Sequence, residues 1–244
     1  MEGRRTTPLF VQVAETLQGR LLRQLYQPGD LLPPARDLER EFGVSNITIR
    51  KALGLLVREG RLVARRGVGT LVAGAPEELV EIEISGDFKE WADSAAGRRL
   101  GLRTLVLDLG LASAPGRVRR LLDLPEGGQV WRLRRLRQFK GRAVSYFLNY
   151  ARPEQAGRLR RKDFRERSFV EAWRELVGVR LARMDQRVRA ALADLDLSNL
   201  LGVEFGAPLF FVETVYFTGD GRAAAVTHMY YRGDRYVYKA SLAL

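Results

Sequence analysis

The order of short elements in residues 8–73 is the feature that most constrains the fold of this chain. Apolar residues recur at helical spacing through the first 25 residues, which predicts an amphipathic helix with Pro8 in its first turn. A turn at 28–30 follows, and Pro33 and Pro34 fix the backbone for a second, short helix that ends near Phe42. Gly43 breaks that helix after about two turns.

The third helix, expected at about 46–59, is the most informative segment. Ser45 can cap it by accepting a hydrogen bond from a backbone N–H of the first turn, and Gly60 ends it. The inward stripe consists of Ile49, Ala52, Leu53, Leu56 and Val57, and the outward side carries Asn46, Ile47, Arg50, Lys51 and Gly54, with Thr48 near the boundary. Two short apolar runs, 61–64 and 70–73, are joined by a basic, glycine-containing turn, which predicts a β-hairpin. This order of elements is that of a winged helix-turn-helix.

The segment also carries a dense set of short motifs. They are Pro8-Leu9-Phe10, Pro28-Gly29-Asp30, Leu32-Pro33, Arg36-Asp37-Leu38, Phe42-Gly43-Val44-Ser45, Thr48-Ile49-Arg50-Lys51-Ala52-Leu53, Glu59-Gly60, and Gly67 with Gly69-Thr70. Together they resemble the DNA-binding domain of the GntR family of bacterial transcription regulators, although no single motif is specific. The resemblance implies an α+β winged helix-turn-helix domain over residues 1–74 that binds a double-stranded DNA operator.

The outward side of the third helix carries the side chains that could read DNA. Arg or Lys can be bidentate to guanine, and Asn, here Asn46 in the first turn, can be bidentate to adenine. The candidate DNA-binding residues are Arg36, where the family has a DNA-contacting Arg, then Ser45, Asn46, Thr48, Arg50 and Lys51, and Arg66, Gly67 and Gly69 of the wing. The alternative is that these residues form an ordinary solvated surface. The family usually has Arg and Thr where this chain has Asn46 and Ile47, so DNA binding is expected but not the usual operator.

Composition changes at residues 75–79, which are expected to be a linker, and residues 80–244 have the pattern of one α+β domain. Strands are expected at 79–84, 102–112, 129–139, 143–150, 184–192, 208–218 and 223–231, and helices near 88–98, 115–123 and 168–177. Hairpin-like turns, such as the one at Lys140 and Gly141, join many of the strands. Connections of this kind favour an antiparallel sheet.

This second part contains further motifs, of which Gly206-Ala207-Pro208-Leu209 and residues 230–236 are fairly specific. They resemble the UTRA effector-binding domain of the HutC-type subfamily over about residues 80–242. The resemblance implies a chorismate-lyase-like fold, a homodimer formed through this domain, and a small-molecule effector that alters operator affinity. It also implies effector-binding residues at Arg135, Arg137 and Ser168, with Tyr230 as a pocket wall.

Alternate residues of a strand face the same side, so Arg135 and Arg137 can converge on one anion. A helix that starts after Ser168 would add backbone donors and a partial positive charge. The alternative is a solvated strand, because Arg132 and Arg134 decorate the other side equally well.

Two departures from the family pattern narrow the effector. Relatives that bind amino-sugar phosphates place a Glu where this chain has Ala225, and Asp87 stands in a Ser-Phe-Ser/Thr motif where its charge would repel a phosphate. A less polar or carboxylated metabolite is therefore expected.

Composition supports a polyanionic partner and excludes several kinds of site. The chain has 41 Lys and Arg residues against 29 Asp and Glu residues, a net charge of +12. It has no Cys and one His, so neither a thiolate zinc site nor a multi-histidine metal site is possible, and no metal or other cofactor is expected. The absence of a long apolar run or a signal-like N-terminus predicts a cytoplasmic protein with no membrane partner.

These observations favour a homodimeric, ligand-responsive transcription regulator, expected to be a repressor, that binds a pseudo-palindromic operator. One alternative is a DNA-binding protein without a ligand response, and a second is a nucleoid-type DNA binder without sequence preference. Another is a lyase-like enzyme, because the second domain's implied fold is shared with a lyase. No pair of a nucleophile and a base supports catalysis, so an enzyme is not expected.

Overall fold

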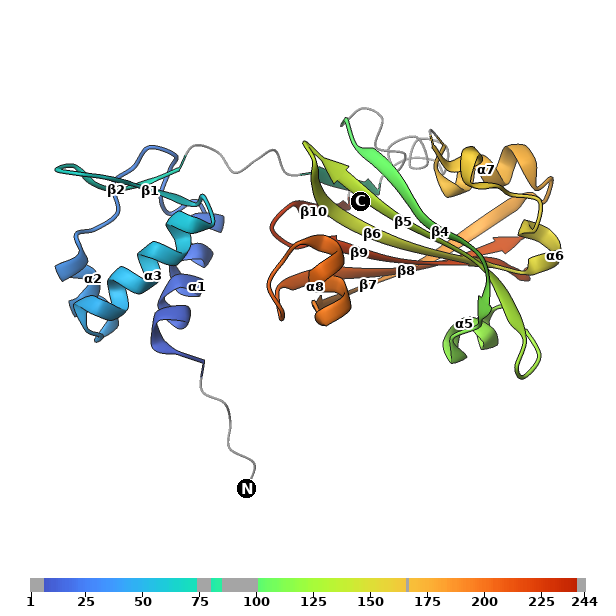
Figure 1. Cartoon of the computed structure of the whole chain (residues 1–244), viewed down its shortest axis with the longest axis horizontal. Coiled ribbons are helices and arrows are strands. Elements are labelled where there is room, and N and C mark those ends of the chain that lie inside the picture. The colour runs from blue at the N-terminus through green and yellow to red at the C-terminus, as the bar shows by residue number, and fades with distance from the viewer. Residues whose placement is uncertain (1–6, 74–79, 85–100, 166, 241–244) are drawn as a thin grey trace, which may run out of the picture. The chain divides into compact units, whose positions relative to one another are not determined.

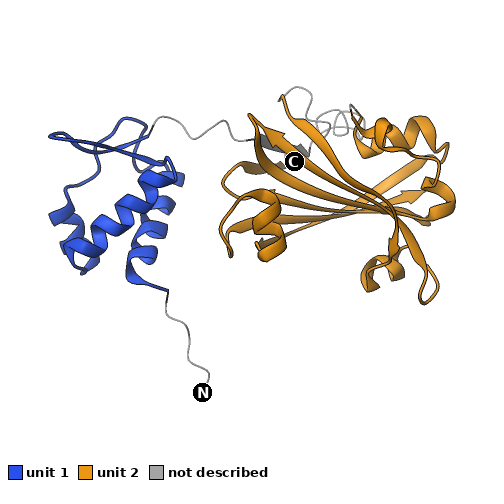
Figure 2. Ribbon diagram, in the orientation of Figure 1, with its two compact units in different colours: residues 1–78 blue, residues 79–244 orange. Residues whose placement is uncertain are grey.

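The computed structural model describes residues 7–73, 80–84, 101–165 and 167–240. The chain divides into two compact units, Met1–Glu78 and Leu79–Leu244, which Figure 2 shows in different colours. Each unit buries its own apolar clusters, as independent domains do.

The first unit is built from three helices and a hairpin (Figure 1). Its elements are α1 (Leu9–Leu22), α2 (Ala35–Phe42), α3 (Asn46–Arg58) and the antiparallel strands β1 (Leu62–Arg65) and β2 (Gly69–Val72). Buried apolar residues from all of these elements form one core, which includes Val13, Leu17, Leu38, Ile49 and Leu56. The winged helix-turn-helix expected from the sequence is confirmed.

The helix α1 ends at Leu22, three residues before the end that the apolar spacing predicts. Gln24 takes a φ of 56°, which stops the helix. The N–H of Gln24 donates to the carbonyl of Leu21, and the N–H of Leu25 donates to the carbonyl of Arg20, each over 3.0 Å. This pair of bonds is a Schellman arrangement, and it satisfies the last carbonyl groups without continuing the helix.

The second unit contains a six-stranded antiparallel sheet with the order β4-β5-β6-β9-β8-β7. Its strands are β4 (Arg103–Ser113), β5 (Gln129–Phe139), β6 (Arg142–Ala151), β7 (Leu181–Leu192), β8 (Pro208–Thr218) and β9 (Ala223–Arg232). A separate parallel pair joins β3 (Val80–Ile84) to β10 (Tyr236–Ala240). The expected antiparallel-sheet domain is confirmed, and the strand expected at 79–84 corresponds to β3, whereas β10 and its parallel pairing with β3 were not predicted.

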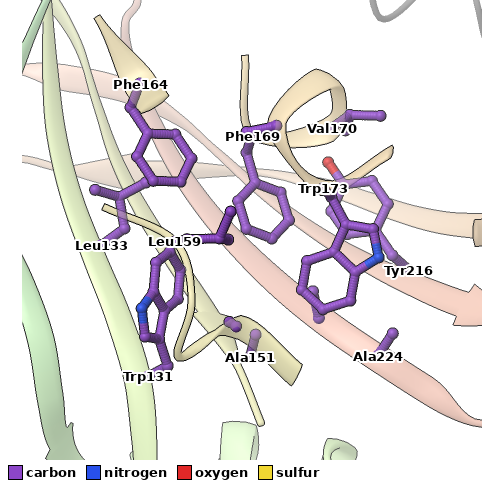
Figure 3. Packing of buried hydrophobic residues seen from close by; sticks show 13 residues of the cluster. Trp131, Leu133, Ala151, Leu159, Phe164, Phe169, Val170, Trp173, Tyr216 and Ala224 are labelled. Atoms are coloured by element: carbon purple, nitrogen blue, oxygen red, sulfur yellow. The ribbon is translucent and has the colours of Figure 1, made fainter. Parts of the chain in front are cut away.

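Helices cover both faces of this sheet. The first face, called here the α7 face, packs against α6 (Pro153–Ala156), the 3-10 helix η2 (Arg161–Phe164) and α7 (Phe169–Leu176). Aromatic rings fill this contact: Trp131 of β5 lies near both Phe164 and Phe169, and Phe169 lies near Trp173 (Figure 3). The opposite face, called the α8 face, packs against α5 (Gly116–Leu121) and α8 (Leu195–Leu201). Strand alternation therefore sends residues 131, 133, 135 and 137 of β5 to the α7 face.

The expected helices near 115–123 and 168–177 correspond to α5 and α7, while the helix expected at 88–98 lies outside the described residues. The sequence did not predict α6 and α8. Among the described residues, no helix has both the length and the apolar character needed to cross a lipid bilayer.

Candidate DNA-binding surface and anion site

The helix α3 buries its apolar side and exposes its basic side. Ile49, Ala52 and Leu56 are buried, whereas Arg50 and Lys51 are exposed. Ser45 is the N-cap, and its side chain accepts a hydrogen bond from the N–H of Thr48 over 3.4 Å. The confirmed third helix thus presents its charged residues to solvent, as a helix that enters the major groove must.

The polar residues in the first turn of α3 contact one another and α2. The Nδ2 of Asn46 donates to Oε1 of Glu39 in α2, and the hydroxyl groups of Ser45 and Thr48 lie 3.0 Å apart. A bidentate contact with adenine uses the oxygen and one of the two N–H groups of an amide, so the bond to Glu39 occupies one donor of Asn46 and leaves the other donor and the oxygen for a base. The structure brings Ser45, Asn46 and Thr48 together, and their polar side chains make contacts within the protein.

The remaining candidates of the first unit are exposed, with Arg36 on α2 and Arg66, Gly67 and Gly69 at the end of the hairpin. Gly67 and Gly69 have φ angles of 78° and 131°. A Cβ atom at Gly69 would lie 3.1 Å from Cδ2 of Leu31, which precedes α2. Glycine at 69 is therefore required by the hairpin itself, whatever its role toward DNA.

We expect Gly69→Ala to lower the free energy of unfolding by about 1–2 kcal/mol, because alanine is strained at this φ and crowds Leu31. Gly54→Ala is the matched control. A Cβ at Gly54, inside α3, meets only Arg58 at 4.0 Å, so this change should stabilise the chain by about 1 kcal/mol. Urea unfolding of the full chain measures both variants, and equal effects would contradict the role given to Gly69.

Arg135 and Arg137 project from β5 onto the α7 face, where 3 % and 7 % of their surfaces are exposed. The Nη2 of Arg135 donates to Oδ1 of Asn149 over 3.0 Å, while its Nε and Nη1 are buried without a hydrogen-bond partner. Both guanidinium groups lie near the ring of Phe147, at 5.6 Å for Arg135 and 4.6 Å for Arg137. The two side chains are buried and converge, so the reading of a solvated strand does not fit.

This part of the α7 face is strongly cationic. Burial, and then the charge of Arg137, lowers the pKa of Arg135 to about 9, which still leaves Arg135 charged at neutral pH. In the six strands as described, every carboxylate lies on the α8 face, namely Asp108, Asp185 and Glu213. Two desolvated positive charges without a carboxylate from the sheet form a site suited to an anion.

A row of polar side chains continues across the α7 face toward β10. The Nδ2 of Asn149 donates to Oγ1 of Thr227 over 2.7 Å, and the Nε2 of Gln186 donates to Oγ1 of Thr214 over 2.9 Å. Thr214 and Thr227 are register partners on β8 and β9. The hydroxyl of Tyr238 in β10 donates to Oε1 of Gln186 over 2.8 Å. The row therefore begins at the amide that contacts the anion site and ends on β10.

A second contact attaches β10 close to Arg137. The hydroxyl of Tyr236 lies 3.0 Å from Oγ of Ser145, which is the register partner of Arg137 on β6. The ring of Tyr236 lies 4.6 Å from the ring of Tyr231. Two tyrosines of β10 thus link the anion site to the parallel pair that contains β3.

Ser168 is buried at the N-terminus of α7, which covers the same face as the two arginines. Its N–H donates to the carboxylate of Glu171 over 2.6 Å, and its Oγ accepts from the N–H of Glu171 over 3.2 Å. In this capping box, the N–H groups of Ser168 and Glu171 donate to side chains of the protein, whereas the sequence analysis expected backbone donors here to bind a ligand. An anion at the N-terminus of α7 would compete with the carboxylate of Glu171.

Tyr230 does not lie on this face, which corrects the expectation that it walls the same pocket. It is the register partner of Tyr146 and Phe211 on the α8 face, where its ring stacks on that of Tyr146 and lies tilted against that of Phe211. The physical reason is strand alternation, which turns adjacent residues of β9 to opposite faces. Tyr231 occupies the α7 face instead. Asp87 lies outside the described residues.

Sequence reasoning missed a cluster on the α8 face in which the buried carboxylate of Glu213 pairs with a half-exposed arginine. Arg117 of α5 donates through Nε and Nη2 to both carboxylate oxygens of Glu213, over 2.7 and 2.6 Å. The Nε2 of His228 lies 3.3 Å from the same carboxylate. Arg117 and Glu213 are 96 residues apart, so no local pattern could have paired them.

An exposed basic helix with a hairpin, followed by a sheet domain with a buried cationic face, defines the class of two-domain DNA-binding regulators. Comparison with known families agrees. Residues 9–72 match the family described as bacterial regulatory proteins, gntR family, and residues 97–237 match the UTRA domain. The chain belongs to the GntR family and carries a UTRA effector-binding domain, so it is a transcriptional regulator rather than an enzyme.

Similar proteins cover almost the whole chain. The HTH-type transcriptional regulator Rv0792c of Mycobacterium tuberculosis is 29 % identical over 98 % of this chain and 88 % of its own length. The HTH-type transcriptional repressor NagR of Bacillus subtilis is 24 % identical over 95 % of this chain and 93 % of its own length. The crystal structure of PhnF from Mycobacterium smegmatis, 24 % identical, covers 95 % of this chain and 99 % of its own, with a TM-score of 0.58, and so shares the fold.

Proposed function

We propose that this chain is a repressor that binds a pseudo-palindromic operator as a homodimer and responds to a small anion on the α7 face. The observation that carries the ligand response is the buried pair Arg135 and Arg137, which shares its face of the six-stranded sheet with no carboxylate from those six strands as described. Two desolvated like charges weaken a fold unless something compensates them. NagR, and the repressor MngR of Escherichia coli at 24 % identity, are named as repressors.

Arg36, Arg50, Lys51 and Arg66 are the proposed DNA contacts, supported by their exposure on the winged helix-turn-helix. A twofold dimer would require half-sites about one helical turn apart. The test is selection of binding sequences from a random duplex pool with the full chain, followed by affinity measurements at matched salt. We expect the selected operator to bind about a thousandfold or more tighter than random duplex.

Two variants with the same charge change complete this test. Arg50→Ala should weaken operator binding, while Arg174→Ala, an exposed arginine of α7, should leave it unchanged. Equal affinity for selected and random duplex would identify a DNA-binding protein without sequence preference. Light scattering of the full chain measures the oligomeric state, and a monomer at micromolar concentration would contradict the dimer.

The proposed ligand is an anion without an ammonium group, and charge balance with two guanidinium groups favours a dianion. An ammonium group needs a carboxylate partner, yet the six strands of the sheet, as described, offer none on the α7 face. Position 225 does lie on this face, but Ala225 is fully buried opposite Tyr216. Thermal-shift screening of dicarboxylates, sugar phosphates and amino-sugar phosphates tests this. Strong stabilisation by glucosamine 6-phosphate would contradict the proposed class.

The parallel pair β3–β10 is the proposed route from the ligand to the DNA-binding unit. Tyr236 and Tyr238 fasten β10 to the α7 face beside the anion site. β10 pairs along its length with β3, and β3 starts at Val80, directly after the segment 75–79 that joins the units. A ligand that favours one arrangement of this face would therefore bias the position of β3. A tenfold change in operator affinity requires about 1.4 kcal/mol of coupling.

We expect Tyr238→Phe to keep ligand binding but to reduce the ligand's effect on operator affinity about fivefold, because it removes one hydrogen bond worth about 1 kcal/mol. Tyr146→Phe is the matched control, since the Tyr146 hydroxyl accepts from Arg134 on the opposite face. Ligand thermal shift and ligand-dependent operator affinity are both measured. A full response in Tyr238→Phe would contradict this route.

A further inference from the structure

The first unit exposes an apolar side chain where a DNA-binding helix meets base edges. Ile47, the second residue of α3, is 68 % exposed, a larger fraction than Leu22 and Leu25 at 62 % or Val68 at 57 %. Of the apolar residues that follow in the same helix, Ile49, Ala52 and Leu56 are buried and the others are partly buried. Ile47 therefore contributes little to the core of the folded unit.

Ile47 shares the outward side of α3 with the basic residues. Arg50 and Lys51 follow it by three and four positions, the spacing at which helix residues are surface neighbours. In winged and other helix-turn-helix domains, the N-terminal residues of this helix contact base edges. A helix that places Arg50 in the major groove would bring Ile47 to the groove as well.

The neighbours of Ile47 are less free to read bases. The amide of Asn46 donates to Glu39, and the hydroxyl of Thr48 lies 3.0 Å from that of Ser45. Ile47 makes no such polar contact, because its side chain can neither donate nor accept a hydrogen bond. It is β-branched, so its χ1 angle is largely fixed in a helix and little rotamer entropy is lost on contact.

One feature of the major groove matches this chemistry. The C5 methyl group of thymine is the apolar group among the donors and acceptors on the base edges there. We propose that Ile47 is a specificity-determining residue that packs against a thymine methyl in each half-site of the operator. This inference rests on the proposed function as an operator-binding dimer, and it names a base that Ile47 requires.

The experiment removes the methyl group from the DNA and the side chain from the protein in turn. The operator selected with the full chain is remade with uracil in place of each thymine, one symmetric pair of half-site positions at a time. At one such pair the unaltered protein should lose about fifteenfold in affinity, about fourfold for each buried methyl. Ile47→Ala should bind the thymine operator more weakly by a similar factor and should be insensitive to uracil at that pair.

Two further variants sharpen the outcome. Ile47→Val keeps a β-branched apolar side chain and should retain most of the uracil penalty. Val63→Ala shortens another exposed apolar residue, in strand β1, and should keep the penalty in full. Ile47 is exposed, so none of these changes should alter the unfolding temperature appreciably.

The possible results separate the role of Ile47 from the proposed function as an operator-binding protein. An operator bound equally well with uracil at every thymine would overturn the role of Ile47 and leave the proposed function intact. A full uracil penalty in Ile47→Ala would do the same, because another residue would then contact the methyl. A pool that yields no preferred sequence would contradict the proposed function itself, and the role of Ile47 with it.

Discussion

An Arg135→Met variant is expected to be more stable than the unaltered chain when no ligand is present. The guanidinium of Arg135 is buried beside Arg137, makes one hydrogen bond, and leaves Nε and Nη1 without partners. Methionine has a similar shape and no charge to desolvate. Replacing a poorly compensated buried ion by an apolar side chain gains about 1–3 kcal/mol, which urea unfolding at neutral pH would measure.

The same variant should lose the thermal shift caused by an anionic ligand, so stability and ligand response change in opposite directions. Arg134→Met is the control, because Arg134 lies on the opposite face and its Nε donates to the hydroxyl of Tyr146 over 2.7 Å. This control should gain no stability and should keep the ligand response. A destabilised Arg135→Met chain would mean that contacts within the protein already compensate the charge of Arg135. That result would contradict the proposal that Arg135 binds an anionic ligand.

Arg117→Met is expected to lower the free energy of unfolding at pH 7 by about 2–4 kcal/mol. It leaves the carboxylate of Glu213 buried, and the Nε2 of His228, 3.3 Å away, is then its remaining side-chain partner among the described residues. Removing one partner of a buried ion pair strands the other charge in a poorly solvated place. The expected loss is in the lower part of the range for broken buried ion pairs, because the side chain of Arg117 is itself 47 % exposed.

The loss should depend on pH with a definite sign. In the unaltered chain, the bond from Arg117 lowers the pKa of Glu213 below 4.5, so this stabilisation is present at neutral pH and is lost in acid. Without Arg117, burial raises the pKa of Glu213, and the carboxyl group is stabilised by taking up a proton. The difference between variant and unaltered chain should therefore shrink from pH 7 to pH 5. Adding Glu213→Gln to Arg117→Met should remove this dependence on pH. If the difference in unfolding free energy between Arg117→Met and the unaltered chain stays constant from pH 7 to pH 5, the role given to the ion pair is contradicted.

The elements that the sequence predicted well are those determined by local chemistry. The Ser45 cap and the apolar stripe placed the third helix at 46–59, and α3 is Asn46–Arg58. Strand-like stretches between glycine-containing turns gave 129–139 and 208–218, which are the bounds of β5 and β8. Both signals need only neighbours in the chain, so they can be read without knowing the fold.

The features that could not be predicted depend on partners distant in the chain. Tyr230 and Tyr231 belong to one motif, yet only the register of β9 against β6 and β8 shows that Tyr231, not Tyr230, shares a face with Arg135. The partner of Glu213 comes from a helix 96 residues away. The spacing of Arg135 and Arg137 was enough to put them on one face, but the absence of a carboxylate there became visible only once the described strands were ordered.

The pairing of β3 with β10 also sets an order of events during synthesis. Every element of the first unit, from Leu9 to Val72, finds its partners within that unit, so it can fold as soon as it leaves the ribosome. β3 emerges next, but residues 236–240, which complete its parallel pair, are made more than a hundred residues later. A nascent chain, or one cut before Tyr236, therefore holds a finished DNA-binding unit before it holds the strand proposed to control it.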